Sequence, residues 1–466
     1  MKKKHLVIVG VIILSAIVIL GLYQTFALSG DITKDTSGYY NVTVTDGTTV
    51  TVPANSTKTV YYKLTNTNKG IVKYGIGYSG TNITVEYFND TQDPVTGTVD
   101  YGKSKFIKLS VENSGTTSST ATLSTILGYE NGGDLIVPSG VTLVTKMTYG
   151  YKNLAKLIAE DTFAPNSTVT NNSITYQYDT KNSLMKDKAG NIRYYGASPN
   201  NYIYFNCSDY ANQSSSTCET WRIIGVFEGK VKLIRGSQIG TYSWDNKNAS
   251  TGAETNYGKN DWTDARLMKL LNPGYESETT GGSLYYNSKS GTCYSGQNNV
   301  TTSCNFTSTG IKNDITRGLI SDTTYYLGGW NDNKIYSNQI YEYERGTKVY
   351  TGRPTEWTGK IALAYPSDYG YAVDLSKCSQ NLYNYDNSTC TSNNWMKTII
   401  APNNGWLLTP FSGDADIAWF VSSSGYVNNY SSASSAGGVA PVLSLNSELA
   451  VKAGKGLSSA PYQLSA

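Results

Sequence analysis

An apolar stretch near the amino terminus is the feature that most constrains how this chain can fold. Residues 6–23 carry no charged side chain, and this is about the length that a helix needs to cross the hydrocarbon core of a bilayer. Three lysines at positions 2–4 precede it and no basic residue follows closely, which predicts a cytoplasmic amino terminus and an extracellular remainder. We therefore expect residues 1–30 to be a cytoplasmic leader and a single-pass transmembrane signal anchor. The alternative is a cleaved signal peptide, since residues 27–29 could form a weak cleavage site.

The six cysteines all lie between residues 207 and 390. An even number of cysteines on the outer side of a membrane is typical of disulfides. The sequence does not determine the connectivity, but the near-equal local spacings favour pairing between neighbours. The expected pairs are Cys207 with Cys218, Cys293 with Cys304, and Cys378 with Cys390. Zinc ligands usually stand about two to four residues apart, often with histidine, so we expect no bound metal and no cofactor.

The charge of the chain argues against a nucleic-acid partner. The chain has 38 lysines and arginines against 35 acidic residues, and the three leading lysines account for the difference. The part predicted to lie outside the cell is therefore close to neutral, whereas proteins that bind nucleic acids carry a basic surface. The partners that we expect are the membrane, through the amino-terminal helix, and a glycan or surface protein.

Residues 31–148 contain neither tryptophan nor cysteine and alternate threonine, valine and tyrosine. Residues 42–52 form two period-two runs around Asp46-Gly47, which is a strong hairpin signal. Further short strands are expected at residues 59–64, 72–78, 83–87, 106–111 and 121–129. Short strands at this spacing indicate an all-β sandwich, which we interpret as a stalk domain. A ligand-binding sandwich is the competing interpretation.

Residues 149–181 are expected to connect the stalk to the rest of the chain. Leu154, Leu157 and Ile158 recur at helical spacing and Pro165 follows soon after, which predicts a short helix. The next stretch, residues 166–180, is rich in asparagine, serine and threonine. We interpret it as a polar linker.

Residues 182–466 have a mixed pattern that predicts an α+β domain stapled by disulfides. Hairpins are expected at residues 221–236, with Gly229 in the turn, and at residues 417–430. One helix should begin after Asp261, and a second should follow further along the chain. Their expected inner faces are Trp262, Ala265, Met268 and Leu270 in the first helix, and Ile311, Ile315 and Leu319 in the second. The core positions expected near the carboxyl end are Trp419, Val421, Val439, Pro441 and Val442.

Two runs near the carboxyl end, residues 419–445 and 454–464, resemble the closing signature of a poorly characterised bacterial surface-protein family. The domain of that family is similar to the C-type-lectin-like fold shared by the formylglycine-generating enzyme and the sulfatase-modifying factors. The supporting matches are NYIYFN at 201–206, WRIIGV at 221–226, YEYERG at 341–346, TGKIALAYPSDYG at 358–370, and the segments around Trp395 and Trp406. The resemblance covers residues 182–466 and implies a C-type-lectin-like domain, although a fold does not specify a function. One departure is Ala440, where relatives tend to carry an arginine, so no contact of that arginine is carried over.

The residues argue against the enzymatic branches of this fold. No cysteine follows Cys390, and the only histidine is His5, so neither formylglycine-generating nor iron-dependent chemistry is expected. Without an extracellular histidine, a serine or cysteine triad also lacks its usual general base. We therefore expect no catalytic residue and no enzymatic activity. The alternative is an extracellular hydrolase that uses two carboxylates, for which the candidates are Glu342, Glu344, Glu356, Asp368, Asp414 and Asp416.

A calcium-lectin motif is also considered. Trp330-Asn331-Asp332 resembles the tripeptide in which a tryptophan precedes two oxygen ligands. The loop that usually accompanies it, Glu-Pro-Asn or Gln-Pro-Asp, is absent from the sequence. We therefore interpret the tripeptide as part of an ordinary loop.

Tyrosine content favours a binding function. The chain has 39 tyrosines, together with abundant serine, asparagine and glycine, and antibody paratopes use the same residue types. The ligand-binding residues that we expect are Tyr426, Asn428, Asn429, Tyr430, Ser432 and Ser434. Cross-strand packing is the alternative role of such tyrosines. The sequence thus predicts a membrane-anchored, adhesin-like or receptor-like binding protein at the cell surface, with a carboxylate-based hydrolase or a structural envelope protein as alternatives.

Overall fold

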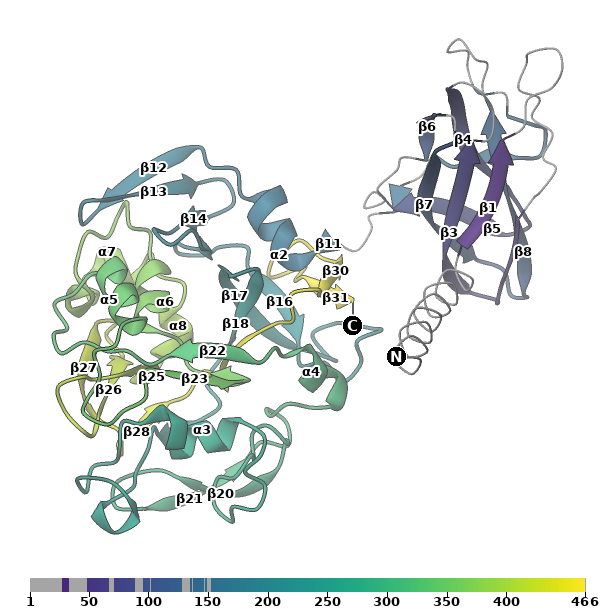
Figure 1. Cartoon of the computed structure of the whole chain (residues 1–466). Helices are drawn as coiled ribbons and strands as arrows, with labels where there is room; N and C mark the ends of the chain where they lie inside the picture. The colour runs from purple at the N-terminus through teal and green to yellow at the C-terminus, as the bar shows by residue number, and fades with distance from the viewer. Residues whose placement is uncertain are drawn as a thin grey trace, which may run out of the picture. The chain divides into compact units, whose positions relative to one another are not determined.

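The structure is a computed structural model of the chain (Figure 1). It describes residues 27–32, 48–66, 71–88, 95–100, 102–127, 135, 137–145, 147–148 and 152–465. The anchor expected at residues 6–23 lies outside these ranges, and no helix within them is long and apolar enough to cross a bilayer. The chain divides into two compact units, Met1–Tyr151 and Lys152–Ala466, and most regular structure in both is β-strand.

Two sheets build the described part of the first unit. The first has the order β1, β3, β7, β5 and β10, and the second has the order β2, β8, β4 and β6, with β9 paired to β4. The strands are β1 (Ala27–Ile32), β2 (Thr48–Val52), β3 (Ser56–Asn66), β4 (Val72–Ser79), β5 (Ile83–Phe88), β6 (Thr96–Val99), β7 (Ser104–Asn113), β8 (Ser119–Leu127), β9 (Thr142–Leu143) and β10 (Met147–Thr148). Alternate residues of both sheets are buried in one shared core, which is the arrangement of a β-sandwich.

The sequence located most of these strands. The five strands expected after residue 58 correspond to β3, β4, β5, β7 and β8, whereas β1, β6, β9 and β10 were not expected. The expected hairpin at residues 42–52 is only partly described. Its second arm is β2, which pairs antiparallel with β8, while residues 42–47 lie outside the described ranges.

A nine-stranded sheet forms the centre of the second unit. Its order is β12, β13, β14, β15, β17, β18, β29 and β24, and β16 pairs with β17. The strands are β12 (Ser167–Asn171), β13 (Ile174–Asp179), β14 (Leu184–Lys186), β15 (Ile192–Tyr194), β16 (Tyr202–Phe205), β17 (Glu219–Phe227), β18 (Lys230–Arg235), β24 (Ile361–Ala362) and β29 (Val442–Ser444). The predicted hairpin of β17 and β18 is confirmed, and Glu228 and Gly229 occupy its turn with φ angles of 51° and 76°. Positive φ at both positions is typical of tight two-residue hairpin turns.

The prediction of a polar linker at residues 166–180 is wrong. This stretch forms the antiparallel hairpin of β12 and β13, which extends the nine-stranded sheet (Figure 1). Tyr176 and Tyr178 are buried, and their side chains lie in a core cluster with Met185 and Tyr371. The reason is that Tyr176 and Tyr178, at alternate positions of β13, supply their rings to the core, even though Thr175 and Gln177 before each of them are polar.

The predicted connector helix is confirmed and belongs to the second unit. It consists of α2 (Leu154–Lys156) and a π-helical continuation, η1 (Leu157–Thr162). The Oδ1 of Asn153 accepts a hydrogen bond from the backbone N–H of Lys156 and so caps its first turn. Leu154 and Ile158 are fully buried in the core of the second unit. Just before α2, β11 (Lys152–Asn153) pairs with β30 (Ala450–Ala453), which in turn pairs with β31 (Gln463–Ser465).

A five-stranded sheet carries the carboxyl-terminal hairpin. Its order is β19 (Thr241–Ser243), β28 (Ala436–Gly438), β25 (Gly405–Pro410), β26 (Ile417–Val421) and β27 (Val427–Ser432). The hairpin expected at residues 417–430 is β26 and β27. All five predicted core residues of this region, namely Trp419, Val421, Val439, Pro441 and Val442, are buried.

Short helices and ribbons complete the second unit. The ribbons are β20 (Ser290–Tyr294) with β21 (Thr301–Asn305), and β22 (Thr323–Tyr326) with β23 (Glu356–Gly359). The helices are η2 (Ala249–Thr251), η3 (Trp262–Asp264), α3 (Arg266–Leu271), α4 (Asp314–Leu319), α5 (Ser337–Glu344), α6 (Pro366–Tyr371), η4 (Leu382–Asn384), α7 (Ser388–Thr391) and α8 (Lys397–Ile400). Helices α5 to α8 gather near β25 to β27 (Figure 1).

The two helices predicted from periodicity after Asp261 and around Ile315 are both present, but each differs in part from its prediction. Asp261 caps the first as predicted, but that helix is split into η3 and α3 at Ala265. The expected inner face of the second helix is partly wrong, because Ile315 is 56% exposed. Asn313 caps α4 at its amino end, so the helix starts after Ile311, and its first turn carries Ile315 toward solvent.

Three disulfides cross-link the second unit. They join Cys207 to Cys218, Cys293 to Cys304, and Cys378 to Cys390, and all six cysteines are buried. The predicted pairing of neighbours is therefore confirmed. Each bridge closes a short loop at a different place in the unit, which restricts the unfolded chain and stiffens the loops around the sheets.

Candidate functional site

The residues expected to form a display face do not all reach the surface. Asn429 and Ser434 are buried, whereas Tyr426, Asn428 and Ser432 are half-buried. The side chain of Tyr430 lies outside the described part of the structure. Among the side chains of this expected face that the structure describes, those accessible are Tyr426, Asn428 and Ser432.

Two contacts hold this partial face in place. The Tyr426 ring packs against the exposed ring of Tyr383, with 5.7 Å between the ring centres. The Oδ1 of Asn428 accepts a hydrogen bond of 2.9 Å from the Nδ2 of Asn333. The face thus contacts the short helix η4 and the loop at Asn333, both distant in sequence, and part of its polar surface is already hydrogen-bonded.

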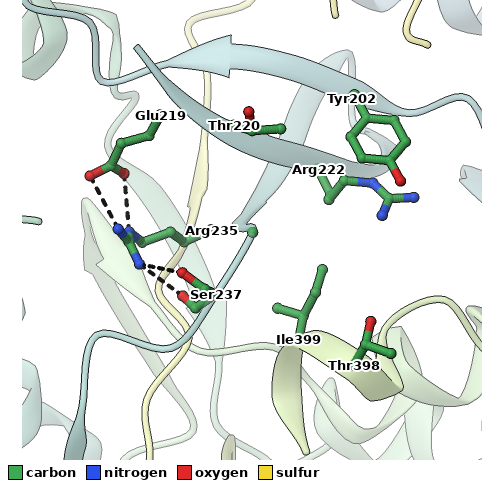
Figure 2. A pocket seen from close by; sticks show the side chains of 9 residues that line it. Tyr202, Glu219, Thr220, Arg222, Arg235, Ser237, Thr398 and Ile399 are labelled. Carbon is green, nitrogen blue, oxygen red and sulfur yellow. Dashed lines mark hydrogen bonds and ion pairs between the residues drawn. The ribbon is translucent and has the colours of Figure 1, made fainter. Parts of the chain in front are cut away.

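A pocket of about 400 Å³ lies on another part of the same unit (Figure 2). This volume falls within the range of about 300–1,000 Å³ that is typical of small-molecule sites. The pocket forms where β16, β17 and the end of β18 face helix α8. Its lining residues are Tyr202, Glu219, Thr220, Arg222, Arg235, Gly236, Ser237, Thr398 and Ile399.

A closed ion pair forms one side of the pocket. The Nε and Nη2 of Arg235 donate to the two carboxylate oxygens of Glu219 at 3.0 and 3.3 Å. The Nη1 of Arg235 donates to the Oγ of Ser237 at 2.8 Å, and the Nε1 of Trp221 donates to Glu219 at 2.9 Å. Both charged side chains are about one-tenth exposed, so this wall is fixed and electrically neutral as a pair.

Arg222 forms the opposite side of the pocket (Figure 2). It lies directly across from Tyr202 in the β16–β17 pairing. Its guanidinium carbon is 3.8 Å from the ring centre of Tyr202 and 4.9 Å from that of Trp395. Its Nε donates to the Oδ1 of Asn201 at 2.5 Å, and its Nη2 donates to the carbonyl oxygen of Pro199 at 3.2 Å. The rings and these acceptors hold the guanidinium plane in one orientation.

The charge of Arg222 is not neutralised by a carboxylate in the described part of the chain. Burial lowers the pKa of Arg222 to about 10, while the nearby Tyr202 acts in the opposite direction. The side chain therefore remains positively charged at neutral pH. A buried charge that has no counter-ion is costly, and a bound anion would reduce that cost.

The pocket lining offers hydrogen-bond donors and acceptors. Its lining includes the hydroxyl groups of Thr220, Ser237 and Thr398, but it contains no histidine or cysteine. The single carboxylate of the lining, Glu219, is held by Arg235 and Trp221. General acid–base catalysis needs a group that can exchange a proton with the substrate, and the lining presents hydrogen-bond donors and a cation instead.

The carboxylates weighed for a hydrolase are spread over several environments. Glu344 and Asp368 are fully buried, and burial raises the pKa of Glu344 to about 7. Burial together with Asp414 also raises the pKa of Asp416, although the hydroxyl of Thr255 hydrogen-bonds to it. The remaining three, Glu342, Glu356 and Asp414, are exposed. None of the six lines the pocket of Figure 2.

The tripeptide that resembles a calcium-lectin motif makes ordinary protein contacts. The Trp330 ring stacks on Tyr343 with 3.7 Å between ring centres, and the Nζ of Lys348 lies 3.7 Å from the Trp330 ring centre. The Oδ1 of Asp332 accepts a hydrogen bond from the backbone of Lys334. Over the described ranges, no group of three or more histidine, cysteine, aspartate or glutamate side chains could hold a metal ion.

Sequence reasoning missed Arg222 as a site residue. A signal was present, because Arg222 interrupts the apolar run from Trp221 to Val226 and therefore places a cation in a buried strand. Comparison of the chain with protein-family models, with curated protein sequences and with solved structures finds no significant match. The interpretation of the pocket accordingly rests on its own geometry.

Proposed function

We propose that this chain is a membrane-anchored extracellular binding protein without enzymatic activity. In this proposal residues 1–30 anchor the chain, the β-sandwich is a stalk, and the second unit is a C-type-lectin-like domain that holds a glycan or protein ligand. The observation that carries the proposal is the pocket of about 400 Å³, whose lining offers hydroxyl groups and one uncompensated cation.

The three disulfides support the extracellular part of the proposal. Disulfides persist in oxidising compartments outside the cytoplasm, and all six cysteines of the chain are paired. They also support a binding role, because a stiff framework loses little conformational entropy when a ligand binds. A protease-shaving experiment on intact cells tests the location, since an extracellular second unit would be removed and a cytoplasmic one would survive.

A pocket-filling variant tests the binding function. Thr398 lines the pocket from α8 and is exposed, so Thr398→Trp should fill the opening without disturbing the core. We expect the full-length chain to bind a subset of a glycan and surface-protein array, and Thr398→Trp to lower that binding about 10-fold or more because the ring occupies the ligand volume.

Thr389→Trp is the matched control. Thr389 is an exposed threonine on the short helix α7 and does not line the pocket, so this variant should bind like the wild type. Unchanged near-ultraviolet circular dichroism would show that both variants fold. If the wild type binds nothing on the array and instead associates with itself, a structural envelope protein would be favoured. Binding that survives Thr398→Trp would move the site away from this pocket.

A further inference from the structure

We infer that the pocket binds an acidic sugar, and that the guanidinium of Arg222 forms the ion pair with its carboxylate. This inference rests on the proposed binding function and names the ligand class for the same site. It depends on the unusual position of Arg222 among the arginines of the second unit, on the free donors of its guanidinium, and on the hydroxyl groups that surround the rest of the pocket.

Arg222 is an exception among the buried arginines that the structure describes. The others each have a carboxylate partner. They are Arg193 with Asp187 and Asp368, Arg235 with Glu219, and Arg353 with Glu254. Arg222 is 8% exposed and has no ion pair with any described residue. Of the two arginines that line the pocket, Arg235 is paired with Glu219, and Arg222 has no carboxylate partner among the described residues.

The guanidinium of Arg222 keeps donors free on the pocket side. Its Nε and one N–H of Nη2 are used by Asn201 and Pro199. Its Nη1 has no hydrogen-bond partner within the described part of the chain, and Nη2 retains a second N–H. Two adjacent N–H groups match the two oxygens of a carboxylate, and such paired, charge-assisted bonds are among the stronger ones in proteins.

The electrostatics of the pocket fit a single negative charge. Its charged lining residues are Arg222, Arg235 and Glu219, and the last two neutralise each other at 3.0 Å. One positive charge remains. A monoanion would complete the balance, whereas a cationic ligand would meet Arg222 at close range without a free carboxylate to offset it.

The remainder of the pocket fits a sugar ring and not only a small carboxylate. The lining also includes the hydroxyl groups of Thr220, Ser237 and Thr398. They can both donate and accept hydrogen bonds, as sugar hydroxyl groups require. Tyr202 is half-buried, so part of its ring remains accessible to the apolar C–H groups of a sugar. The volume of about 400 Å³ exceeds what a carboxylate alone would occupy.

The test measures binding of defined sugars to the full-length chain by isothermal titration calorimetry. The probes are methyl glucuronide and N-acetylneuraminic acid as acidic sugars, methyl glucoside as the neutral analogue, methyl glucuronamide as the uncharged isostere, and acetate as a bare carboxylate. We expect at least one acidic sugar to bind, with its neutral analogue and with acetate each about 10-fold or more weaker.

The variants are Arg222→Gln, Arg222→Lys and the control Arg266→Gln. Arg266 also lies against a ring, Tyr294, at 3.8 Å and bonds to an asparagine, Asn246, but it does not line the pocket. Arg222→Gln should weaken acidic-sugar binding about 10-fold or more. Arg222→Lys should retain part of this binding, because lysine keeps the positive charge but lacks the paired N–H donors of the guanidinium. Arg266→Gln should bind like the wild type.

The outcomes separate this inference from the proposed function. Suppose that Thr398→Trp abolishes binding to the array, but acidic and neutral sugars bind with equal affinity and Arg222→Gln has no effect. The acidic-sugar inference would then be overturned, and the proposed binding function would stand. Binding of a peptide carboxyl terminus, but of no sugar probe, would overturn the acidic-sugar inference as well. If no sugar probe binds and the chain also binds nothing on the array, both the acidic-sugar inference and the proposed binding function would be overturned. The glucuronamide comparison needs no variant, so it decides the point even where Arg222→Gln fails to fold.

Discussion

Arg193 and Arg222 are both buried in the second unit and both lie against aromatic rings, yet their surroundings differ. The Nε and Nη1 of Arg193 donate to Asp187 at 2.6 Å and to Asp368 at 3.0 Å. Arg222 has only neutral acceptors within the described structure and opens onto the pocket of Figure 2. One arginine is enclosed by protein charges, and the other faces a space that a ligand can enter.

The pKa values reflect this difference. Burial alone would lower the pKa of Arg193, but the carboxylates of Asp187 and Asp368 outweigh that effect and raise it. Burial lowers the pKa of Arg222 to about 10, and no carboxylate opposes it. A complete set of counter-ions therefore marks an arginine that stabilises the fold, and a missing counter-ion next to a cavity marks one that is available to a ligand.

Removing the counter-ion of the enclosed arginine should have the largest effect. Asp368 accepts hydrogen bonds from Arg193 and Lys232 and from the backbone of Tyr365. Asp368→Ala leaves two buried cations short of a partner, which costs about 3–5 kcal/mol of stability. Urea unfolding followed by tryptophan fluorescence measures this, since all eight tryptophans lie in the second unit.

An exposed ion pair is the control for this variant. Asp314 pairs with Arg317 at 2.7 Å, but its side chain is 97% exposed. Asp314→Ala should therefore shift the unfolding midpoint only slightly, because exposed pairs contribute little. Equal shifts for Asp314→Ala and Asp368→Ala would mean that the buried ion pairs of Asp368 do not stabilise the second unit. The proposed difference in role between Arg193 and Arg222 would then be wrong.

The pH dependence of stability should come from the enclosed region and not from the pocket. Burial raises the pKa of Glu344 to about 7 from its ordinary value of 4.5, while its neighbour Arg345 acts in the opposite direction. The folded state then binds this proton more tightly than the unfolded state. The contribution is fully present below pH 4.5 and is lost as the pH rises toward 7, an effect on the order of 3 kcal/mol.

Glu344→Gln imitates the protonated side chain and should remove this dependence. Its unfolding free energy should change less than that of the wild type between pH 4.5 and 7, as measured by urea titrations at several pH values. Binding of an acidic sugar should stay constant over the same range, because Arg222 remains charged. A slope that persists in Glu344→Gln would place the responsible proton on another group.

The comparison also explains what sequence reasoning could reach. The disulfide pairs and the hairpin of β17 and β18 depend on short-range spacing, and both were predicted correctly. The hairpin of β12 and β13 was interpreted as a linker because its polar residues outnumber the tyrosines at alternate positions. Ile315 was placed inside because periodicity alone does not show that the cap at Asn313 starts the helix.

The two arginines look alike in the sequence. Arg193 stands between Ile192 and Tyr194, and Arg222 stands between Trp221 and Ile223. Only the tertiary structure brings Asp368 to Arg193 from a helix that follows far along the chain. Asp187 lies only six residues from Arg193, but the second counter-ion, Asp368, could not be assigned to it from local patterns.

Replacing Arg222 should change stability least, and this gives the finest test of the comparison. Arg222→Gln loses two hydrogen bonds and the contacts with the rings of Tyr202 and Trp395, but it also removes a buried charge that has no counter-ion. These opposing effects should leave the unfolding free energy within about 1 kcal/mol of the wild type. Without ligand, the urea midpoint should therefore resemble that of Arg266→Gln.

Adding an acidic sugar should separate Arg222→Gln from the wild type. A ligand that binds only the folded state raises the unfolding midpoint as its concentration exceeds the dissociation constant. The wild type and Arg266→Gln should both show this rise, and Arg222→Gln should not. If Arg222→Gln instead loses as much stability as Asp368→Ala without any ligand, then Arg222 supports the fold in the same way as Arg193. In that case the missing counter-ion would be no indication of a binding site.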